Sequence, residues 1–454
     1  MALLPLMRGI LAIERQPGEL VPHNQLDRLA GFGLITSAVL YLCFNAFGGM
    51  VRGILGPIGL APIAYLPFVV GLVSLLANTL ARVGDPQTST SQFVVLAFLF
   101  LEVLISISLG RSIGVVLFSL YICTAIFVAM AVTQRGMQDR MIRAMVPIFY
   151  VSVVGVVLSS IIEFPWAHST YEVMGVQREA TREWSAGGRA RLAGFSQASY
   201  MASAVIIISY CAAEHECKTL FKKALCWAAG CYAIYLTTSK SVLLAMLALP
   251  VTYAAIGRIQ ANDGAKRKSL ATILLAFWVM LIFAGPLLSI TYGKQIYPQG
   301  VGEGPSYSSL ADRVLNTWPQ AIGLVDWSNP ASWLVGRGLG GIGGPMAMVD
   351  PNTANSADNL AVYLIVMFGA VSIAIGYLIF RGGQRAIDAG GRGRREFAMI
   401  IAMLGVGTAA NVIEATFTAM VVGLAVGRQP SRSAAYVKKR RGHRARDKAS
   451  GTAA

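Results

Sequence analysis

Long apolar runs recur along almost the whole chain and constrain its fold more than any other feature. Several of these runs reach the ~20 residues that an α-helix needs to cross ~30 Å of hydrocarbon. Hydrophobic residues make up 55% of the 454 residues, whereas charged residues make up only 13%. The sequence therefore predicts an all-α, polytopic integral membrane protein with a single transmembrane domain over residues 1–454.

About twelve transmembrane helices are predicted from the apolar runs. Their ranges are 29–48, 54–80, 92–110, 112–132, 145–163, 193–213, 224–238, 241–257, 269–291, 358–380, 396–412 and 413–427. Three prolines, Pro57, Pro62 and Pro67, are expected to break the second range. The last two ranges barely suffice for two crossings, so they predict a short or tilted hairpin with Asn411 and Glu414 near its turn.

The distribution of charge between these runs predicts how the chain is oriented. Basic residues gather at 135–143, 218–223, 258–268 and 381–395. Alternation of sides from a cytoplasmic N-terminus places all four groups, and both termini, in the cytoplasm, as the positive-inside rule requires. In a bacterium, this is the topology of a multi-pass protein of the inner (cytoplasmic) membrane. The net charge of +16 reflects this asymmetry, so no nucleic-acid partner is expected.

Two long polar loops then face the periplasm. The first is 164–192 and the larger is 292–357, whereas the basic tail 428–454 is expected to lie against anionic lipid in the cytoplasm. The larger loop is expected to contain short helices, because apolar residues recur at helical spacing over 309–322. Such a segment, lying on the membrane surface, would hold Arg313 over the helical bundle.

Arginines in the periplasmic loops run against the positive-inside rule and need another explanation. They are Arg178, Arg182, Arg189, Arg191, Arg313 and Arg337. A guanidinium group matches the geometry of a phosphate, so arginines in loops packed on a membrane bundle often serve an anionic ligand. The sequence thus predicts an anion site on the periplasmic face.

Four short motifs follow one another in the second half of the chain. They are Arg191-Leu-Ala-Gly194, Ser239-Lys240-Ser241, the glycine-rich run Gly336–Gly344, and Asp358-Asn359. Each motif also has a simple structural interpretation. Arg191 and Lys240 would snorkel at the membrane interface, the glycines would form a flexible turn, and Asp358 would cap the following helix.

Taken in order, these motifs resemble the O-antigen ligase/polymerase superfamily of bacterial envelope proteins. The resemblance covers roughly residues 190–425 and includes Arg313 upstream of Trp318, and Gly369 in the helix after Asp358-Asn359. Lys240 stands where the family has an arginine. Asp358 stands where the ligases usually have a histidine, and this favours a Wzy-like polymerase.

The resemblance implies a metal-independent glycosyltransferase that uses undecaprenyl-pyrophosphate-linked oligosaccharide. Such an enzyme transfers the glycan onto the next lipid-linked repeat unit at the periplasmic face, in exopolysaccharide, O-antigen or capsule biosynthesis. A flippase and a chain-length regulator are the implied protein partners. No cofactor is expected, and the four scattered histidines, with no HExxH motif, give no metal site.

The resemblance also implies roles for individual residues. Arg191 and Arg313 would stabilise the leaving pyrophosphate, and Asp358 would orient or deprotonate the acceptor hydroxyl. The residues with an implied substrate-binding role are Lys240, Arg337, Gly338, Gly340 and Asn359.

Two alternatives remain open from the sequence. Within the superfamily, an O-antigen ligase would transfer the finished polysaccharide to lipid A-core. A polysaccharide flippase or secondary transporter also has about twelve spans, but it tends to carry charges within its spans and to have short external loops. The long arginine-bearing loop favours the enzyme over the transporter.

Overall fold

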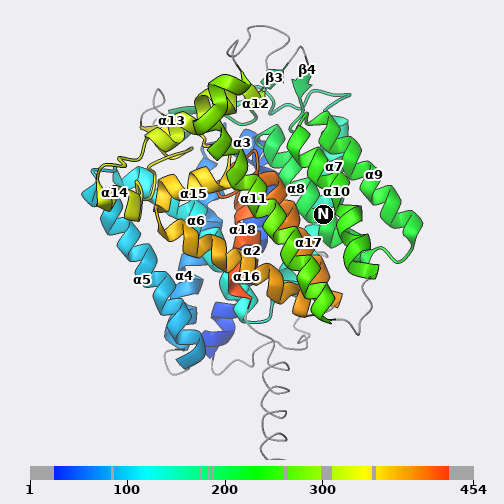
Figure 1. Ribbon diagram of the computed structural model, residues 1–454, viewed down its shortest axis with the longest axis horizontal. Helices are drawn as coiled ribbons and strands as arrows, with labels where there is room; N and C mark the ends of the chain where they lie inside the picture. The colour runs from blue at the N-terminus through cyan, green and yellow to red at the C-terminus, as the bar shows by residue number, and fades with distance from the viewer. Residues whose placement is uncertain are drawn as a thin grey trace, which may run out of the picture.

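The computed structural model describes residues 25–82, 86–173, 176–182, 184–186, 189–258, 264–297, 309–349, 354–389 and 391–428, and they are mostly helical. The helices are α2 (Gln25–Ala46), α3 (Gly48–Leu55), η1 (Ala61–Tyr65), α4 (Leu66–Ala81), α5 (Pro86–Ser108), α6 (Ile113–Gln134), α7 (Gln138–Leu158), α8 (Ser199–Glu216), α9 (Leu220–Leu236), α10 (Lys240–Arg258), α11 (Gly264–Ile296), α12 (Ser309–Asp312), η2 (Arg313–Thr317), α13 (Trp318–Gly323), α14 (Pro330–Val335), η3 (Met346–Met348), α15 (Leu360–Phe368), α16 (Val371–Asp388), α17 (Gly391–Gly407) and α18 (Thr416–Gly427). Figure 1 shows them as one bundle.

Six of the described helical stretches are long and apolar enough to cross a membrane. They are α2, the η1–α4 stretch, α6, α7, α10 and α11. This is the pattern of a membrane protein. Each of the twelve predicted ranges contains helix, but the remaining helices do not meet that length and composition, so the count of twelve spans stays a prediction.

Two predicted ranges are interrupted, and the last two form a hairpin. The second range holds the end of α3, the short η1 and α4, as its prolines led us to expect. The range 358–380 is divided at Gly369, whose φ of +54° ends α15 before α16 begins. The last pair forms the predicted hairpin, and its second helix begins at Thr416, so Glu414 lies in the connection between α17 and α18.

The first polar loop contains four short strands, so the expectation of an all-α fold is incomplete. Strands β1 (Thr170–Val173) and β2 (Val176–Glu179) pair antiparallel, as do β3 (Trp184–Ala186) and β4 (Arg189–Arg191). Their aromatic and β-branched residues favour extended structure, and Gly187-Gly188 between β3 and β4 is a hairpin signal in the sequence.

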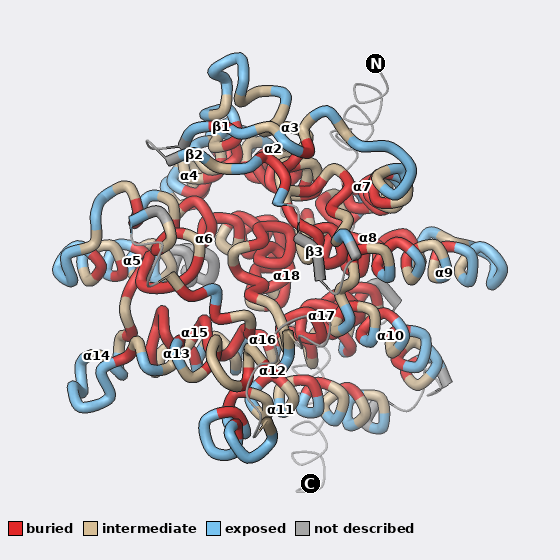
Figure 2. Tube along the Cα trace, turned by 90° about the horizontal axis from the view of Figure 1, so that it is seen from above, coloured by how far each residue is buried: buried red, intermediate tan, exposed pale blue. Residues whose placement is uncertain are grey.

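Helix α18 lies at the centre of the bundle and is buried along nearly its whole length (Figure 2). It packs closely against α6, because a Cβ atom at Gly423 would overlap the Ile126 carbonyl and one at Gly427 would meet Met130. Small residues let membrane helices approach in this way and gain dispersion energy. By contrast, α11 lies at the periphery and exposes large apolar side chains, which suits contact with lipid.

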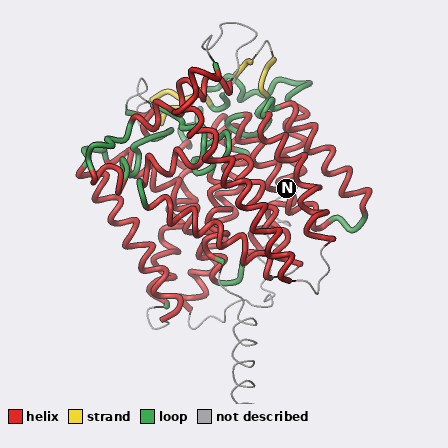
Figure 3. Tube along the Cα trace, viewed as in Figure 1, coloured by secondary structure: helices red, strands yellow, loops and turns green. Residues whose placement is uncertain are grey.

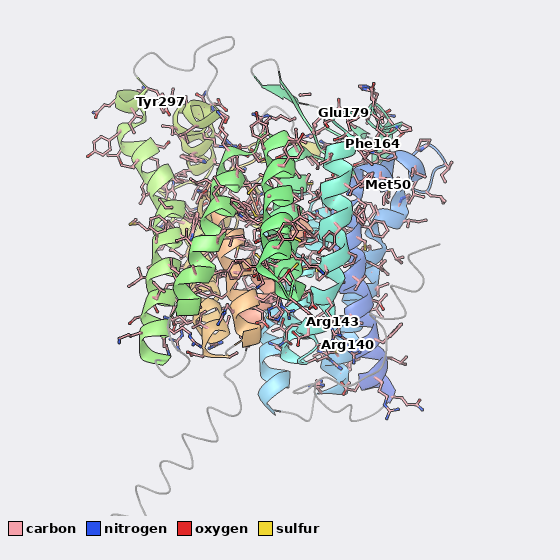
Figure 4. All side chains as sticks on the ribbon, turned by 90° about the vertical axis from the view of Figure 1, so that its right-hand side faces the viewer. Met50, Arg140, Arg143, Phe164, Glu179 and Tyr297 are labelled. Atoms are coloured by element: carbon pink, nitrogen blue, oxygen red, sulfur yellow. The ribbon has the colours of Figure 1, made fainter. Side chains whose placement is uncertain are left out.

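The loops and strands gather at one end of the bundle, which we call the loop end (Figure 3). Figure 4 shows Phe164, Glu179 and Tyr297 at this end, and Arg140 and Arg143 at the opposite, basic end. The polar loops and the basic connection are therefore separated as the charge pattern predicts. Beyond Arg428, the basic tail lies outside the described residues, as do 298–308 and 350–353 of the larger loop.

Candidate functional site

A cavity of about 450 Å³ opens at the loop end of the bundle. It lies between the end of α2, the first turns of α6 and α8, the β1–β2 hairpin and the connection before α18. Charged and polar side chains form much of its wall. They are Asn45, Arg52, Gln177, Arg178, Glu179, Arg182, Gln197, Glu414 and Thr416.

Arg52 is held in the cavity wall by uncharged neighbours. It lies on α3, which the chain enters directly after α2. Its Nη1 donates to Oε1 of Gln197 at 3.1 Å, and its guanidinium lies 5.9 Å from the ring centroid of Tyr171. Gln197 in turn donates to the Tyr171 hydroxyl at 3.3 Å. These contacts fix the direction of Arg52 without cancelling its charge.

Arg178 and Arg182 reach the same wall from the first polar loop. Arg178 lies on β2 opposite Tyr171 of β1, and its Nη2 donates to the Ala347 carbonyl at 3.3 Å. The backbone N–H of Arg182 donates to the Gln197 carbonyl at 2.7 Å, which ties the loop to the start of α8. Both residues belong to the arginine group that the sequence singles out.

Two of the three arginines in this wall, Arg52 and Arg178, are held by neutral groups. Within the described part of the chain, neither Arg52 nor Arg178 forms a salt bridge with a carboxylate. A guanidinium held by carbonyl and amide groups keeps its full charge toward an open cavity. The cavity therefore has the electrostatics of a site for an anion.

Glu414 is the acidic group on the inner side of the cavity. Its Oε1 accepts a hydrogen bond from the Gly344 N–H at 2.7 Å. Burial raises the pKa of the Glu414 carboxyl from its ordinary 4.5 to about 7, and the negative charge of Asp358 adds to this rise. The Gly344 N–H and Arg182 act in the opposite direction. A carboxyl with a pKa near neutrality is suited to accept and return a proton.

Aromatic side chains form the apolar floor of the cavity. Tyr121 is at their centre, with its ring centroid 5.2 Å from that of Tyr65 in an edge-on arrangement and 6.0 Å from that of Phe118 in a stacked one. Phe44 also lines this floor. The cavity thus combines a cationic wall with an apolar surface, as a ligand with a charged group and a less polar body would need.

Two of the predicted catalytic residues contact each other. Arg313, the first residue of η2, places Nε 3.1 Å from Oδ2 of Asp358, and both side chains are partly exposed. Asp358 and Ala357 have φ angles of +41° and +61°, a conformation that side-chain-bearing residues seldom adopt. Such strain is often found at functional sites. The expected helix over 309–322 is present as α12, η2 and α13, and it holds Arg313 over α11.

Asn359, rather than Asp358, caps α15, so the simple interpretation of Asp358 as a helix cap is wrong. The Oδ1 of Asn359 accepts from the N–H groups of Ala361 and Val362, and its Nδ2 donates to the carbonyls of Ile282 and Thr408. Asn359 is fully buried. The structure therefore assigns it a packing role, and its contact with substrate stays a prediction.

The glycine-rich run is buried rather than a flexible turn. Gly338 and Gly340 have φ angles of +70° and +80°, and a Cβ atom on them would overlap Ser106 and Val115 respectively. The intervening Leu339 N–H donates to Oγ of Ser106 at 2.7 Å. These glycines let the loop enter the bundle beside α5 and α6, and their contact with substrate stays a prediction.

Arg337 is engaged by the loop that carries it. Its Nε donates to the Gly341 carbonyl at 3.0 Å and its Nη1 to the Leu324 carbonyl at 2.6 Å. Burial lowers the pKa of Arg337, and the positive charge of Arg111 lowers that pKa further. Arg337 clamps the glycine-rich run and does not line the cavity.

Arg191 and Lys240 also lie apart from the cavity wall. Arg191 ends β4 opposite Trp184, and Lys240 is the exposed first residue of α10. The side chain of Arg189 lies outside the described residues. The structure thus brings together Arg313 with Asp358, and Arg178 with Arg182, but it does not place Arg191 or Lys240 in this wall.

Sequence reasoning missed Arg52 and gave Glu414 no chemical role. Arg52 lies at the loop end, between the first two predicted spans, so the argument from the positive-inside rule applied to it as well. Its partners Tyr171 and Gln197 are more than a hundred residues away, and no local pattern links them. Glu414 was visible only as a polar residue near a membrane hairpin.

No protein-family model, no curated protein and no solved structure matches this chain.

Proposed function

We propose that the protein is a polysaccharide polymerase that acts on glycans linked to undecaprenyl pyrophosphate. The proposal rests above all on Arg52 and Arg178, which line the cavity at the loop end and form no salt bridge among the described residues. A pyrophosphate is the anion that a set of guanidinium groups suits best. The apolar floor would receive the first part of the polyprenyl chain, which arrives sideways from the membrane.

The reaction would be a direct displacement at the sugar. The acceptor hydroxyl oxygen forms a bond to the anomeric carbon of the donor, and the bond from that carbon to the pyrophosphate oxygen breaks. Undecaprenyl pyrophosphate leaves with the bonding electrons, and Arg52, Arg178 and Arg182 stabilise its charge. Glu414 takes the proton of the acceptor hydroxyl. Each atom and charge is then accounted for without a cofactor.

Asp358 would act beside this step by orienting the acceptor. Its Oδ2 is bound to Arg313 and its Oδ1 accepts from Oγ of Ser356 at 2.7 Å. Asp358 is already engaged by Arg313, whereas Glu414 lines the cavity and has its pKa raised to about 7. We therefore assign positioning to the Arg313–Asp358 pair and proton transfer to Glu414.

A chain-extension assay tests this proposal directly. Purified protein in lipid nanodiscs is given the lipid-linked repeat units of its own host, and the products are separated by length. We expect a ladder of polymer from the wild type, little from Arg178→Ala, and partial recovery in Arg178→Lys. Arg381→Ala is the matched control, because Arg381 is an exposed arginine on α16, which runs toward the basic end.

The same assay separates the two members of the superfamily. A ligase would make no ladder from repeat units alone and would instead transfer glycan to added lipid A-core. Polymer from Arg178→Ala at the wild-type rate would show that the cavity arginines do not serve the reaction.

The proposed location is the periplasmic face of the bacterial inner membrane, with flippase and chain-length regulator as partners. Single cysteines at Glu179 and Arg143, placed in a cysteine-free background, test the orientation (Figure 4). An impermeant reagent should label position 179 but not position 143 in intact spheroplasts. The reverse result would put the cavity on the cytoplasmic side and exclude the proposed donor path.

A further inference from the structure

A second hollow of about 340 Å³ lies beside the Arg313–Asp358 pair and is separate from the arginine-lined cavity. Helices α12, η2 and α13 form one side of it, and residues 354–356 form the other. The side chains that define it are Asp312, Asn316, Thr317, Gln320, Asn355 and Ser356. We call it the polar groove. Its volume is within the ~300–1,000 Å³ that is usual for ligand sites.

The chemistry of the polar groove is unlike that of the cavity. Among the described residues, its lining consists of amides, hydroxyls, one carboxylate and the methyl group of Ala354, with no arginine, lysine or large apolar side chain. The carboxylate of Asp312 would repel a phosphate, and an acyl or prenyl chain would find no apolar surface. Amides, hydroxyls and carboxylates are the donors and acceptors that match the hydroxyl groups of a neutral sugar.

The groove is built by hydrogen bonds that leave part of its polar surface available. Asp312 accepts from Nδ2 of Asn316 at 2.9 Å and from Oγ1 of Thr317 at 3.4 Å. Asn355 donates to the Thr317 carbonyl at 2.9 Å and so joins the two sides. Gln320 is exposed and has no hydrogen-bond partner among the described residues. The amide of Gln320 and the Asn316 carbonyl oxygen can therefore bind a ligand.

The backbone of the groove also has an unusual conformation. Residues Arg313–Thr317 form a π-helical turn between two short α-helices. Single π-turns within α-helices are rare and occur frequently at functional sites. Here the turn carries Arg313 at one end and two groove residues, Asn316 and Thr317, at the other. One element therefore presents both the partner of Asp358 and the groove wall.

Short connections link the polar groove to the proposed reaction site. Ser356, in the groove, donates to Asp358 at 2.7 Å. The backbone carbonyl of Asn355, also in the groove, accepts a hydrogen bond from the Gly343 N–H at 2.9 Å. Gly343 packs directly against Glu414. Ser356 and Asn355 thus connect the polar groove to Asp358 and, through Gly343, to Glu414 in the wall of the arginine-lined cavity.

We propose that the polar groove binds the neutral, hydroxyl-rich part of the acceptor glycan. This inference rests on the proposed function and adds a second subsite to it. The pyrophosphate of the donor occupies the arginine-lined cavity, while the acceptor sugar lies in the groove and directs one hydroxyl toward Asp358 and Glu414.

Direct binding of a lipid-free glycan tests the groove without the transfer reaction. The probe is the repeat-unit oligosaccharide released by mild acid from the host's lipid-linked material, and its affinity for the full-length protein in nanodiscs is measured by calorimetry. We expect Asn316→Ala and Gln320→Ala each to weaken binding on the order of threefold to tenfold, as the loss of one hydrogen bond would. The matched control is Asp326→Ala, a polar loop residue bonded to Ser328 outside the groove.

A further variant separates this inference from the proposed function. Arg178→Ala should leave the affinity for the lipid-free oligosaccharide unchanged, because that probe has no pyrophosphate. No binding by the wild type, or equal binding by wild type and both groove variants, would overturn the groove. Weakened binding in the groove variants of a protein that makes no polymer would keep the groove as a glycan site and reject the polymerase.

Discussion

Arginines lie near both ends of α2, but they have different partners at the two ends. Near its start, at the basic end, Asp27 is fully buried and pairs with Arg82 at 3.2 Å and with Arg135. Arg135 also donates to Oδ1 of Asn78 at 2.6 Å. Near the other end, Arg52 is bonded to an amide and a ring, and it faces a cavity of about 450 Å³.

The function of an arginine is therefore indicated by the groups that it contacts and not by its presence alone. Asp27 is in the first turn of α2, while Arg82 and Arg135 follow the last turns of α4 and α6, where helix dipoles favour these charges. They lock three helix ends together, and both guanidinium groups are buried against Asp27. At the loop end, Arg52 on α3 and Arg178 on β2 are held by neutral groups, and their positive charge remains available to a ligand.

The largest effect is expected from breaking the buried cluster. Asp27→Asn leaves two buried guanidinium groups without their carboxylate, and the free energy of unfolding should fall by about 3–5 kcal/mol. Thermal unfolding in detergent and the yield of membrane-inserted protein measure this loss. Asp388→Asn is the control, because it removes an exposed pair with Lys268 and should cost at most about 1 kcal/mol. Equal behaviour of the two variants would refute the structural role of the cluster.

The second largest effect is expected at the loop end, where replacing Arg52 should reduce activity and leave stability nearly unchanged. Arg52→Ala removes one hydrogen bond and one ring contact, so the midpoint of unfolding should change little. Chain extension should slow on the order of 10²-fold, because a cation at the leaving group is missing. Arg135→Ala should show the reverse, with a strong loss of stability. A large drop in stability for Arg52→Ala would remove the distinction between the two ends.

The third effect concerns pH. Since the pKa of Glu414 is about 7, its basic form is lost as the pH falls through 7, and the rate should drop about tenfold per pH unit below that point. Glu414→Gln should be slow at every pH and should lack this dependence.

The same carboxyl makes a prediction about stability. The pKa of Glu414 in the folded protein is above its ordinary value of 4.5, so the folded state binds the proton more tightly than the unfolded state does. The folded protein therefore loses stability as the pH rises from 4.5 to 7. Glu414→Gln should therefore unfold at a higher temperature than the wild type at pH 8, and at a similar temperature at pH 4.

For the reaction itself, a wild-type rate of chain extension that is flat from pH 5 to 8 would argue against Glu414 as the base.

The smallest effect is expected at Asp358. Asp358→Asn keeps the size and most of the hydrogen bonding of the side chain, and α15 keeps its cap at Asn359. Chain extension should slow about tenfold, because orientation is impaired and the base is intact. The fall in rate at low pH should persist and move to lower pH, because the charge of Asp358 no longer raises the pKa of Glu414. A loss of 10²-fold or more, together with disappearance of that fall in rate, would make Asp358 the base.

The sequence predicted the coarse fold and singled out two of the arginines that line the candidate site. The lengths of the apolar runs located a helix in every expected range. The positive-inside rule singled out Arg178 and Arg182. The pairing of Arg313 with Asp358 joins residues 45 positions apart, and Arg52 contacts Gln197 across 145 positions. Such contacts depend on how the helices and loops pack, and no local pattern encodes them. For the same reason the glycine-rich run looked flexible, although neighbouring helices enclose it.

Binding of undecaprenyl pyrophosphate tests the central claim most directly, because the cavity at the loop end is proposed to hold that anion. The affinity of full-length protein in nanodiscs is compared for undecaprenyl pyrophosphate and undecaprenol, in the wild type and in the Arg52→Gln/Arg178→Gln double variant. We expect the wild type to prefer the pyrophosphate, and the double variant to lose on the order of 10²-fold of that affinity with no change for undecaprenol. Equal affinity of the wild type for both lipids, or an unchanged double variant, would contradict the account.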